Sequence, residues 1–192
     1  MLYLLYGTEN YLIKKEIDKI LDTNSIEKIN VSEYNLEIDN FKDIIEDANT
    51  ISLFADKKAI IVNNSYIFTG KNIKSDNDPE LFLDYFKNIN PDSIIIFTTD
   101  SEKLDERKKL VKEIKKIGTV KEFNKKNDLT DILKNMFEDY NVSIQDIRFM
   151  IDRCGNNLDI LSQEVNKIKI YKDTDKNITR EDIINLTSKN ID

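Results

Sequence analysis

Gly7 is the first residue whose position could serve chemistry, because it follows the apolar segment Leu2–Tyr6 and precedes a helical pattern. A strand, a glycine and a helix are the setting of a phosphate-binding loop. That loop has the pattern GxxxxGK[ST] and holds phosphates with backbone amides and a lysine. Counted from Gly7, the second glycine is replaced by Leu12, the lysine by Ile13 and the Ser/Thr by Lys14. The pattern therefore favours an ordinary strand-to-helix turn with a degenerate loop at Gly7, and it predicts no nucleotide cofactor.

Asn63 and Asn64 stand where a nucleotide hydrolase would carry its magnesium-binding acid pair, directly after the apolar run Ala59–Val62. Amides neither supply the charge that magnesium needs nor activate a water molecule. The chain has no histidine and a single cysteine, Cys154. This excludes histidine-dependent catalysis and a multi-cysteine zinc site. Cys154 lies on an apolar stripe and is expected in the core. The sequence predicts no catalytic residue and no metal site.

Basic residues cluster between Lys103 and Lys116, and the pattern predicts one helix over 104–117 that carries them. The favoured interpretation is the solvated face of that helix. The alternative is contact with nucleic-acid phosphates, above all by Lys103, Arg107 and Lys108. The whole chain has 29 basic and 36 acidic residues and a net charge of −7. This charge speaks against a protein that grips duplex DNA alone.

Leu53 and Phe54 are large apolar side chains in an unusual place. They stand between a helical pattern that ends near Ala48 and the apolar run Ala59–Val62, and so in a connection. Connections run over the surface, whereas large apolar residues are usually buried. Two interpretations stay open from the residues alone. The turn is tucked under the sheet, or it presents Leu53 and Phe54 to a partner.

The elements that position these residues alternate between strand and helix up to about residue 125, which predicts an α/β domain with a mainly parallel sheet. Ile94–Phe97 is the most hydrophobic segment and should be the central strand. At 192 residues, 40% of them apolar and 34% charged, the chain is long enough for one or two domains. The five predicted strands are Leu2–Tyr6, Ile26–Tyr34, Ala59–Val62, Ile94–Phe97 and Thr119–Phe123.

After residue 127 every pattern is helical. Ser143 with Asp146 and Thr179 with Asp182 have the spacing of helix N-caps, and Gly155 is expected to end a helix. We therefore predict two domains, 1–127 and 128–192, the second with three to four helices. No apolar run reaches the length of a membrane span and no signal peptide is recognisable, so cytoplasm is the expected location.

Several segments, in this order, resemble the delta subunit family of the bacterial DNA polymerase III clamp loader. The N-terminal YLLYGTENYL and the segment SLFADKK before a strand are two of them. The resemblance covers nearly the whole chain. Its segments are Tyr3–Leu12, Ser52–Lys58, Ile94–Phe97, Lys103–Leu110, Cys154–Leu158 with Leu161, Glu164, Lys167 and Tyr171, and Ile178–Asp182.

The resemblance implies an AAA+-like α/β domain without nucleotide binding, then a helical lid domain. It implies that Leu53 and Phe54, with Ser52 beside them, are a hydrophobic wedge that inserts into the sliding clamp (the beta subunit) and opens it. The implied further partners are the other clamp-loader subunits, in the full-length protein, and DNA through the assembled complex. The family's third, collar domain is absent from this sequence, so we expect an isolated monomer here, without a membrane partner.

Two other functions were weighed against this one. A nucleotide-dependent AAA+ ATPase, or another α/β nucleotide-binding enzyme, is supported only by the strand, Gly7 and the helix. Direct DNA binding by the basic segment Lys103–Lys116 predicts strongly salt-dependent binding by the isolated chain. We expect neither ATP hydrolysis by this chain nor strong DNA binding by it alone; its enzymatic context is the polymerase holoenzyme.

Overall fold

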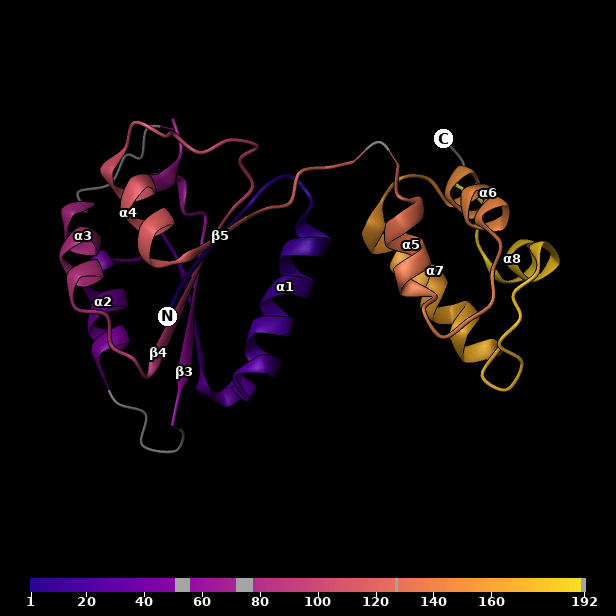
Figure 1. Ribbon diagram of the computed structural model, residues 1–192, viewed down its shortest axis with the longest axis horizontal. Coiled ribbons are helices and arrows are strands. Elements are labelled where there is room, and N and C mark those ends of the chain that lie inside the picture. Colours follow the sequence, from indigo (N-terminus) through magenta and orange to yellow (C-terminus); the bar gives the residue numbers. More distant parts are fainter. Residues whose placement is uncertain (51–55, 72–77, 127, 191–192) are drawn as a thin grey trace. The chain divides into compact units, whose positions relative to one another are not determined.

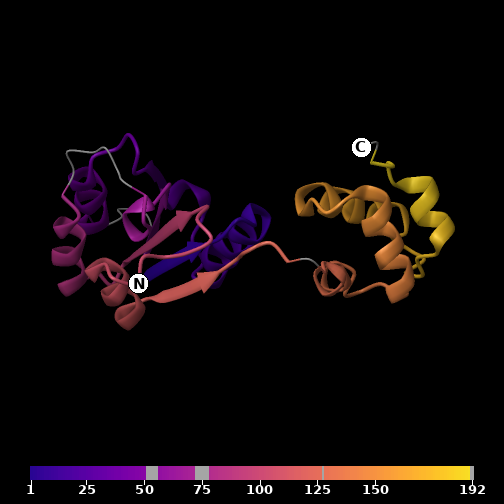
Figure 2. The ribbon, with the colours of Figure 1, turned by 90° about the horizontal axis from the view of Figure 1, so that it is seen from above.

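The computed structural model describes residues 1–50, 56–71, 78–126 and 128–190. The chain forms two compact units, the α/β unit (Met1–Lys125) and the helical unit (Lys126–Asp192). Figures 1 and 2 show strands only in the first unit and helices with their connections in the second. Within the described residues, no helix is both long and apolar enough to cross a membrane.

The sheet of the α/β unit has five strands in the order β2-β3-β4-β1-β5, and every neighbouring pair is parallel. Every residue of β4 is buried, which confirms that the most hydrophobic segment lies inside the sheet. A strand that is buried on both faces of a parallel sheet has a continuous apolar sequence. The prediction of a parallel sheet is confirmed. The strands are β1 (Leu2–Tyr6), β2 (Val31–Asn35), β3 (Lys58–Asn63), β4 (Ser93–Thr99) and β5 (Thr119–Glu122).

Helices cover both faces of the sheet, α1 on one side and α2, α3 and α4 on the other (Figure 1). The three-helix side holds the larger core. Its centre is Phe97 of β4, whose ring lies 5.1 Å from the ring of Phe68 and 5.3 Å from that of Phe82, both nearly edge-on. The helices are α1 (Asn10–Thr23), α2 (Phe41–Asn49), α3 (Glu80–Lys87) and α4 (Lys109–Ile117).

Two predicted elements begin later in the chain than expected. Helix α4 begins at Lys109 rather than Leu104, because the Asp105 amide donates to Phe68 O (2.9 Å) and the Lys108 amide to Asp105 O (3.0 Å). These bonds hold a turn where the periodicity predicted helix. Strand β2 begins at Val31, after a short 3-10 turn over Lys28–Asn30.

The N-terminus of α1 has no side-chain cap. Asn10 is the first helical residue, and Glu9 takes the N-cap position without a side-chain cap bond. The turn between β1 and α1 therefore consists of Gly7, Thr8 and Glu9.

Three helices of the helical unit have side-chain N-caps. Ser143 accepts a hydrogen bond from the Asp146 amide, Thr179 and Asp182 form a reciprocal capping box, and Gly155 ends a helix at φ +85. All three features confirm what the sequence spacing indicated, because caps are set by residues only a few positions apart. The helices are α5 (Thr130–Met136), α6 (Ile144–Cys154), α7 (Leu158–Tyr171) and α8 (Arg180–Leu186).

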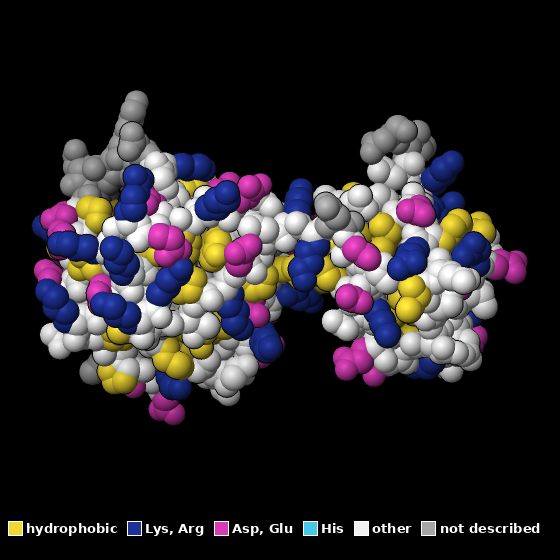
Figure 3. Space-filling model, turned by 45° about the horizontal axis from the view of Figure 1, so that its top comes forward, with side chains coloured by type: hydrophobic (Ala, Val, Ile, Leu, Met, Phe, Trp, Pro, Cys, Tyr) yellow, Lys and Arg dark blue, Asp and Glu magenta, His cyan; other side chains and the backbone are white. Residues whose placement is uncertain are grey.

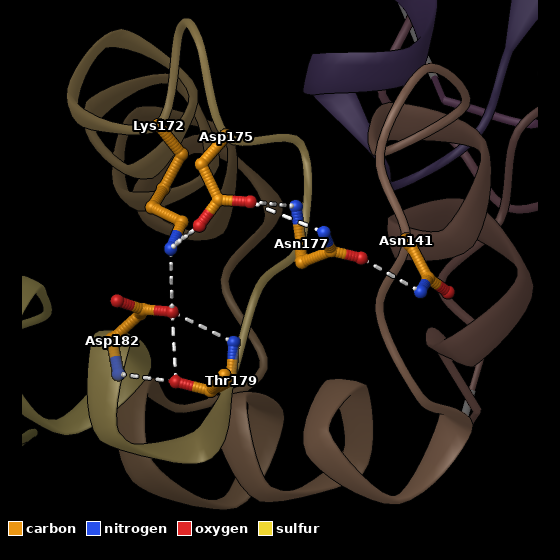
Figure 4. A network of polar contacts seen from close by, with 6 residues as sticks. All are labelled: Asn141, Lys172, Asp175, Asn177, Thr179 and Asp182. Atoms are coloured by element: carbon orange, nitrogen blue, oxygen red, sulfur yellow. Dashed lines mark hydrogen bonds and ion pairs between the residues drawn. The ribbon is translucent and has the colours of Figure 1, made fainter.

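A polar network ties the connection between α7 and α8 to the cap of α8 (Figure 4). Lys172 Nζ lies 2.7 Å from Asp175 Oδ2 and 3.2 Å from Asp182 Oδ2. Asp175 also accepts from the Asn177 amide, and these bonds, the Lys172 bond first, hold the pKa of Asp175 at about 2. Burial acts to raise the pKa of Asp182, but the bonds from Thr179 and Lys172 outweigh it and lower this pKa.

The stability that Asp175 contributes should be present above pH about 4 and fade toward pH about 2. The folded pKa lies below the unfolded value of about 3.9, so the ionised form favours the folded state and acid favours unfolding. We expect Asp175→Asn to unfold at lower urea concentration than the wild type at pH 7, with a gap that narrows below pH about 4. Urea titrations followed by circular dichroism at several pH values measure it.

Asp173→Asn is the matched control, because Asp173 is 85% exposed and its nearest cation, Lys176 Nζ, is 3.8 Å away. At pH 7 the urea midpoint of Asp173→Asn should lie closer to that of the wild type than the midpoint of Asp175→Asn does. If the difference in urea midpoint between Asp175→Asn and the wild type did not change with pH, ionised Asp175 would not be the stabilising group.

Candidate functional site

The turn between β1 and α1 is too short and too well bonded to act as a phosphate loop. Only Gly7, Thr8 and Glu9 separate Tyr6 from the first helical residue. The Gly7 amide donates to Thr99 O (3.1 Å), and the Glu9 amide donates to Phe123 O (2.8 Å). A phosphate loop leaves such amides free for the ligand. Here two of the three amides are already satisfied by the ends of β4 and β5.

Gly7 is also in close contact with the chain that follows β5. A Cβ built on Gly7 would lie 2.3 Å from both the carbonyl carbon and the oxygen of Phe123, and Gly7 has φ +136. The space beside the turn is therefore filled by backbone. Glycine is required here for close approach between two chain segments, and not for approach to a phosphate.

The two asparagines after β3 hold the end of the sheet together. Asn63 Oδ1 accepts from Thr98 Oγ1 (2.9 Å) at the end of β4. Asn64 adopts φ 53, a left-handed conformation that asparagine tolerates, and its Nδ2 donates to Asn35 Oδ1 (3.1 Å). These amides connect β2, β3 and β4. Their role in the described structure is to satisfy neighbouring polar groups.

A hollow of about 320 Å³ lies at this carboxyl edge of the sheet. Ligands of open parallel sheets bind at this edge, so it is where a nucleotide would be sought. Among the described residues that line it, only Lys14 and Asp100 are charged, and Asp100 also pairs with Lys71 at 3.5 Å. Among the described residues, no group of three or more His, Cys, Asp or Glu could hold a metal. The hollow is lined by Asn10, Ile13, Lys14, Ile17, Asn63, Asn64, Thr98, Thr99 and Asp100.

The candidate phosphate contacts Lys103, Arg107 and Lys108 lie before α4 and not on it. Arg107 forms two hydrogen bonds of 2.9 Å to the carboxylate of Asp105, and these bonds lower the pKa of Asp105 to about 2. Lys108 Nζ donates to Ile67 O (3.0 Å). Lys103 is exposed. Phosphate contact by these residues stays a prediction, and two of them already have partners within the chain.

The charges of the surface are mixed. On the face seen in Figure 3, the Lys and Arg side chains of each unit are interspersed with Asp and Glu side chains. A nucleic-acid-binding surface usually gathers its positive charge into one patch or stripe. This face offers no such patch.

The predicted wedge residues Ser52, Leu53 and Phe54 lie outside the described residues. What is described is the chain on either side, from Thr50 at the end of α2 and from Asp56 before β3. Because β3 begins at Lys58, this connection enters the sheet at its amino edge. The connection and the hollow therefore belong to opposite edges of the sheet.

Cys154 is buried and free, and burial raises the pKa of its thiol. This agrees with the prediction of a core residue. A thiol with a raised pKa is a poor nucleophile.

Comparison with known proteins supplies the family. Residues 3–124 match the sequence profile of the family described as DNA polymerase III, delta subunit. The chain belongs to this family. A curated relative, DNA polymerase III subunit delta of Bacillus subtilis (strain 168), is 28% identical over 200 positions, which cover 99% of this chain and 57% of the relative.

Solved structures agree with the delta family assignment. The Bacillus subtilis DNA clamp loader delta protein matches with a TM-score of 0.86 and 26% identity, over 98% of this chain and 58% of that protein. The chain thus spans somewhat more than half the length of these relatives. The RuvB Holliday junction branch migration motor of Thermotoga maritima matches with a TM-score of 0.55 and 12% identity, over 96% of this chain and 60% of RuvB. This second likeness shows the fold alone.

Proposed function

We propose that this chain is the part of a clamp-loader delta subunit that binds the sliding clamp and opens it, and that it hydrolyses no ATP itself. The observation that carries the proposal is membership of the delta family, together with a structural likeness, over 98% of this chain, to a DNA clamp loader delta protein. The chain then contributes binding energy to the opening of the clamp and does not catalyse a reaction.

The clamp contact is assigned to Ser52, Leu53 and Phe54. They stand in the connection between α2 and β3, and connections generally run over the surface of a domain. Apolar anchors inserted into a pocket supply most of the energy of a typical interface. The helical unit acts as the lid domain, with other loader subunits and DNA as partners of the full-length protein in the cytoplasm.

Surface plasmon resonance with the immobilised cognate sliding clamp tests the proposal. The wild-type chain should bind the closed clamp with a measurable Kd, and the complex should survive raised salt, because apolar contacts are weakly screened. An albumin-coated surface is the control. Absence of binding up to the highest soluble concentration would overturn the proposed function.

We expect no ATP binding by the chain, since the turn at Gly7 has two amides bonded to Thr99 O and Phe123 O and Asn63 and Asn64 replace an acid pair. Isothermal calorimetry with ATP and magnesium should give no heat above dilution. Micromolar binding would contradict this and would favour the nucleotide-dependent alternative.

A further inference from the structure

Lys58 is a buried lysine with an unusual set of partners. It is the first residue of β3 and is only 8% exposed. Its ammonium donates to the carbonyl oxygen of Asp47, to Asp47 Oδ1 (2.9 Å) and to Thr50 Oγ1 (2.6 Å). All three donors of the ammonium are thus used. The acceptors all lie at the C-terminal end of α2.

A second layer of bonds holds the same helix end. Ala48 O accepts from Ser93 Oγ (2.6 Å) and from Asn90 Nδ2 (3.0 Å). The Lys58 amide donates to Asp92 O (3.0 Å). Two carbonyls in the last turn of α2, Asp47 O and Ala48 O, therefore accept from side chains at or just before the starts of β3 and β4. A cation at this place also complements the negative end of the helix dipole.

Tyr34 adds a further contact to the bonds among Lys58, Asp47 and Thr50. Its hydroxyl donates to Asp47 Oδ2 (3.1 Å), so both oxygens of Asp47 are engaged, one by Lys58 and one by Tyr34. The position of the Lys58 ammonium is therefore fixed from two elements, α2 and β2.

Stability alone does not explain a lysine at this position. Burying an ammonium carries a large desolvation cost, and an apolar residue of similar volume is often as stabilising or more so. What an apolar residue could not do is bond Thr50. The Lys58–Thr50 bond joins the residue that ends α2 to the residue that starts β3, and so it closes the base of the connection 51–57.

We propose that Lys58 is a positioning residue for clamp binding, and that it acts by holding the two ends of the connection that carries Ser52, Leu53 and Phe54. This inference rests on the proposed function. Its physical basis is pre-organisation: a segment whose ends are fixed before binding loses less conformational freedom when it binds. Lys58 itself is buried and need not touch the clamp.

The test compares clamp affinity for the wild type and for Lys58→Met, which keeps the apolar stem and removes the ammonium. We expect a Kd about 10-fold weaker for Lys58→Met, by surface plasmon resonance on the immobilised clamp. Lys121→Met is the matched control. It removes a partly buried lysine of the same unit, whose ammonium lies 2.6 Å from Glu16 Oε1, and its Kd should stay within about 2-fold of wild type.

A double-mutant cycle separates positioning from a general loss of stability. If Lys58 acts through the apolar pair, Lys58→Met should weaken binding far less in a Phe54→Ala background than in the wild type. Equal losses in both backgrounds would overturn the inference. Should Lys58→Met fail to fold, Thr50→Val removes the bond between Lys58 and Thr50 and should weaken clamp binding about 3-fold.

The outcomes distinguish this inference from the proposed function. If the wild type binds the clamp and Lys58→Met binds equally well while folded, the positioning role is wrong and the proposed function stands. If the wild type does not bind at all, the proposed function is wrong, and the positioning role falls with it.

Discussion

Replacing both Leu53 and Phe54 by alanine should weaken clamp binding at least about 30-fold. Truncating one apolar anchor of an interface costs about 2 kcal/mol or more, which corresponds to about 30-fold in Kd. The loss should appear mainly in the dissociation rate, because variants of one interface differ more in dissociation than in association. Surface plasmon resonance resolves the two rates. Thermal unfolding of the double variant should match the wild type if both side chains are exposed.

Ile38→Ala is the control for this experiment. Ile38 is 81% exposed and lies between β2 and α2, at the carboxyl edge of the sheet. Its replacement removes a comparable exposed apolar side chain from the same unit and should leave the Kd unchanged. A double variant that bound as tightly as the wild type would show that Leu53 and Phe54 are not the contact, and clamp binding would have to be sought elsewhere.

The proposed clamp contact and the degenerate loop at Gly7 belong to opposite edges of the sheet, so the two proposals are compatible. The connection before β3 enters at the amino edge, whereas the turn at Gly7 and the pair Asn63 and Asn64 lie at the carboxyl edge. Substitutions at the carboxyl edge, around Gly7, Asn63 and Asn64, need not move the residues at the start of β3, at the amino edge. A nucleotide site can therefore degenerate without disturbing the residues that support the α2–β3 connection.

Local sequence pattern predicted what depends on near neighbours. The buried strand β4 was evident from Ile94–Phe97, and the capping box of Thr179 and Asp182 from a spacing of three residues. The five-stranded parallel sheet followed from the alternation of strand and helix. In each case the physical cause lies within a few residues, or in a periodicity that one segment carries by itself.

What pattern could not predict depends on distant partners. The turn before α4 is held by the bond from the Asp105 amide to Phe68 O, and no local signal contains Phe68. Gly118 follows α4 in an extended conformation, at φ −122. It is crowded by a distant segment, since an added Cβ would meet Leu2 O at 2.9 Å.

Lys58 was missed for the same reason. Two adjacent lysines, Lys57 and Lys58, are usually both exposed to solvent. Lys58 is buried because its acceptors lie at the end of α2. A usable signal existed in hindsight: a charged residue directly before the apolar run Ala59–Val62, at the start of a central strand, needs a buried partner.

Gly7→Ala should destabilise the α/β unit by about 3 kcal/mol or more. Alanine at φ +136 is strained, by about 1–3 kcal/mol, and overpacking adds a similar amount. The clash cannot be relieved by rotating a side chain, because the atoms 2.3 Å from the new Cβ are the backbone carbonyl of Phe123. Either the end of β5 moves away or β1 shifts. Both movements break the bond from the Phe123 amide to Tyr6 O and the bond from the Glu9 amide to Phe123 O.

Thermal unfolding of the full chain measures this loss, and we expect a midpoint roughly 10 °C lower. Gly70→Ala is the matched control, because a Cβ at Gly70 meets nothing within 4 Å, and its midpoint should stay close to that of the wild type. An unchanged midpoint for Gly7→Ala would mean that Phe123 does not pack against the turn. The turn would then have room for a ligand, and a phosphate loop at this edge of the sheet would again be possible.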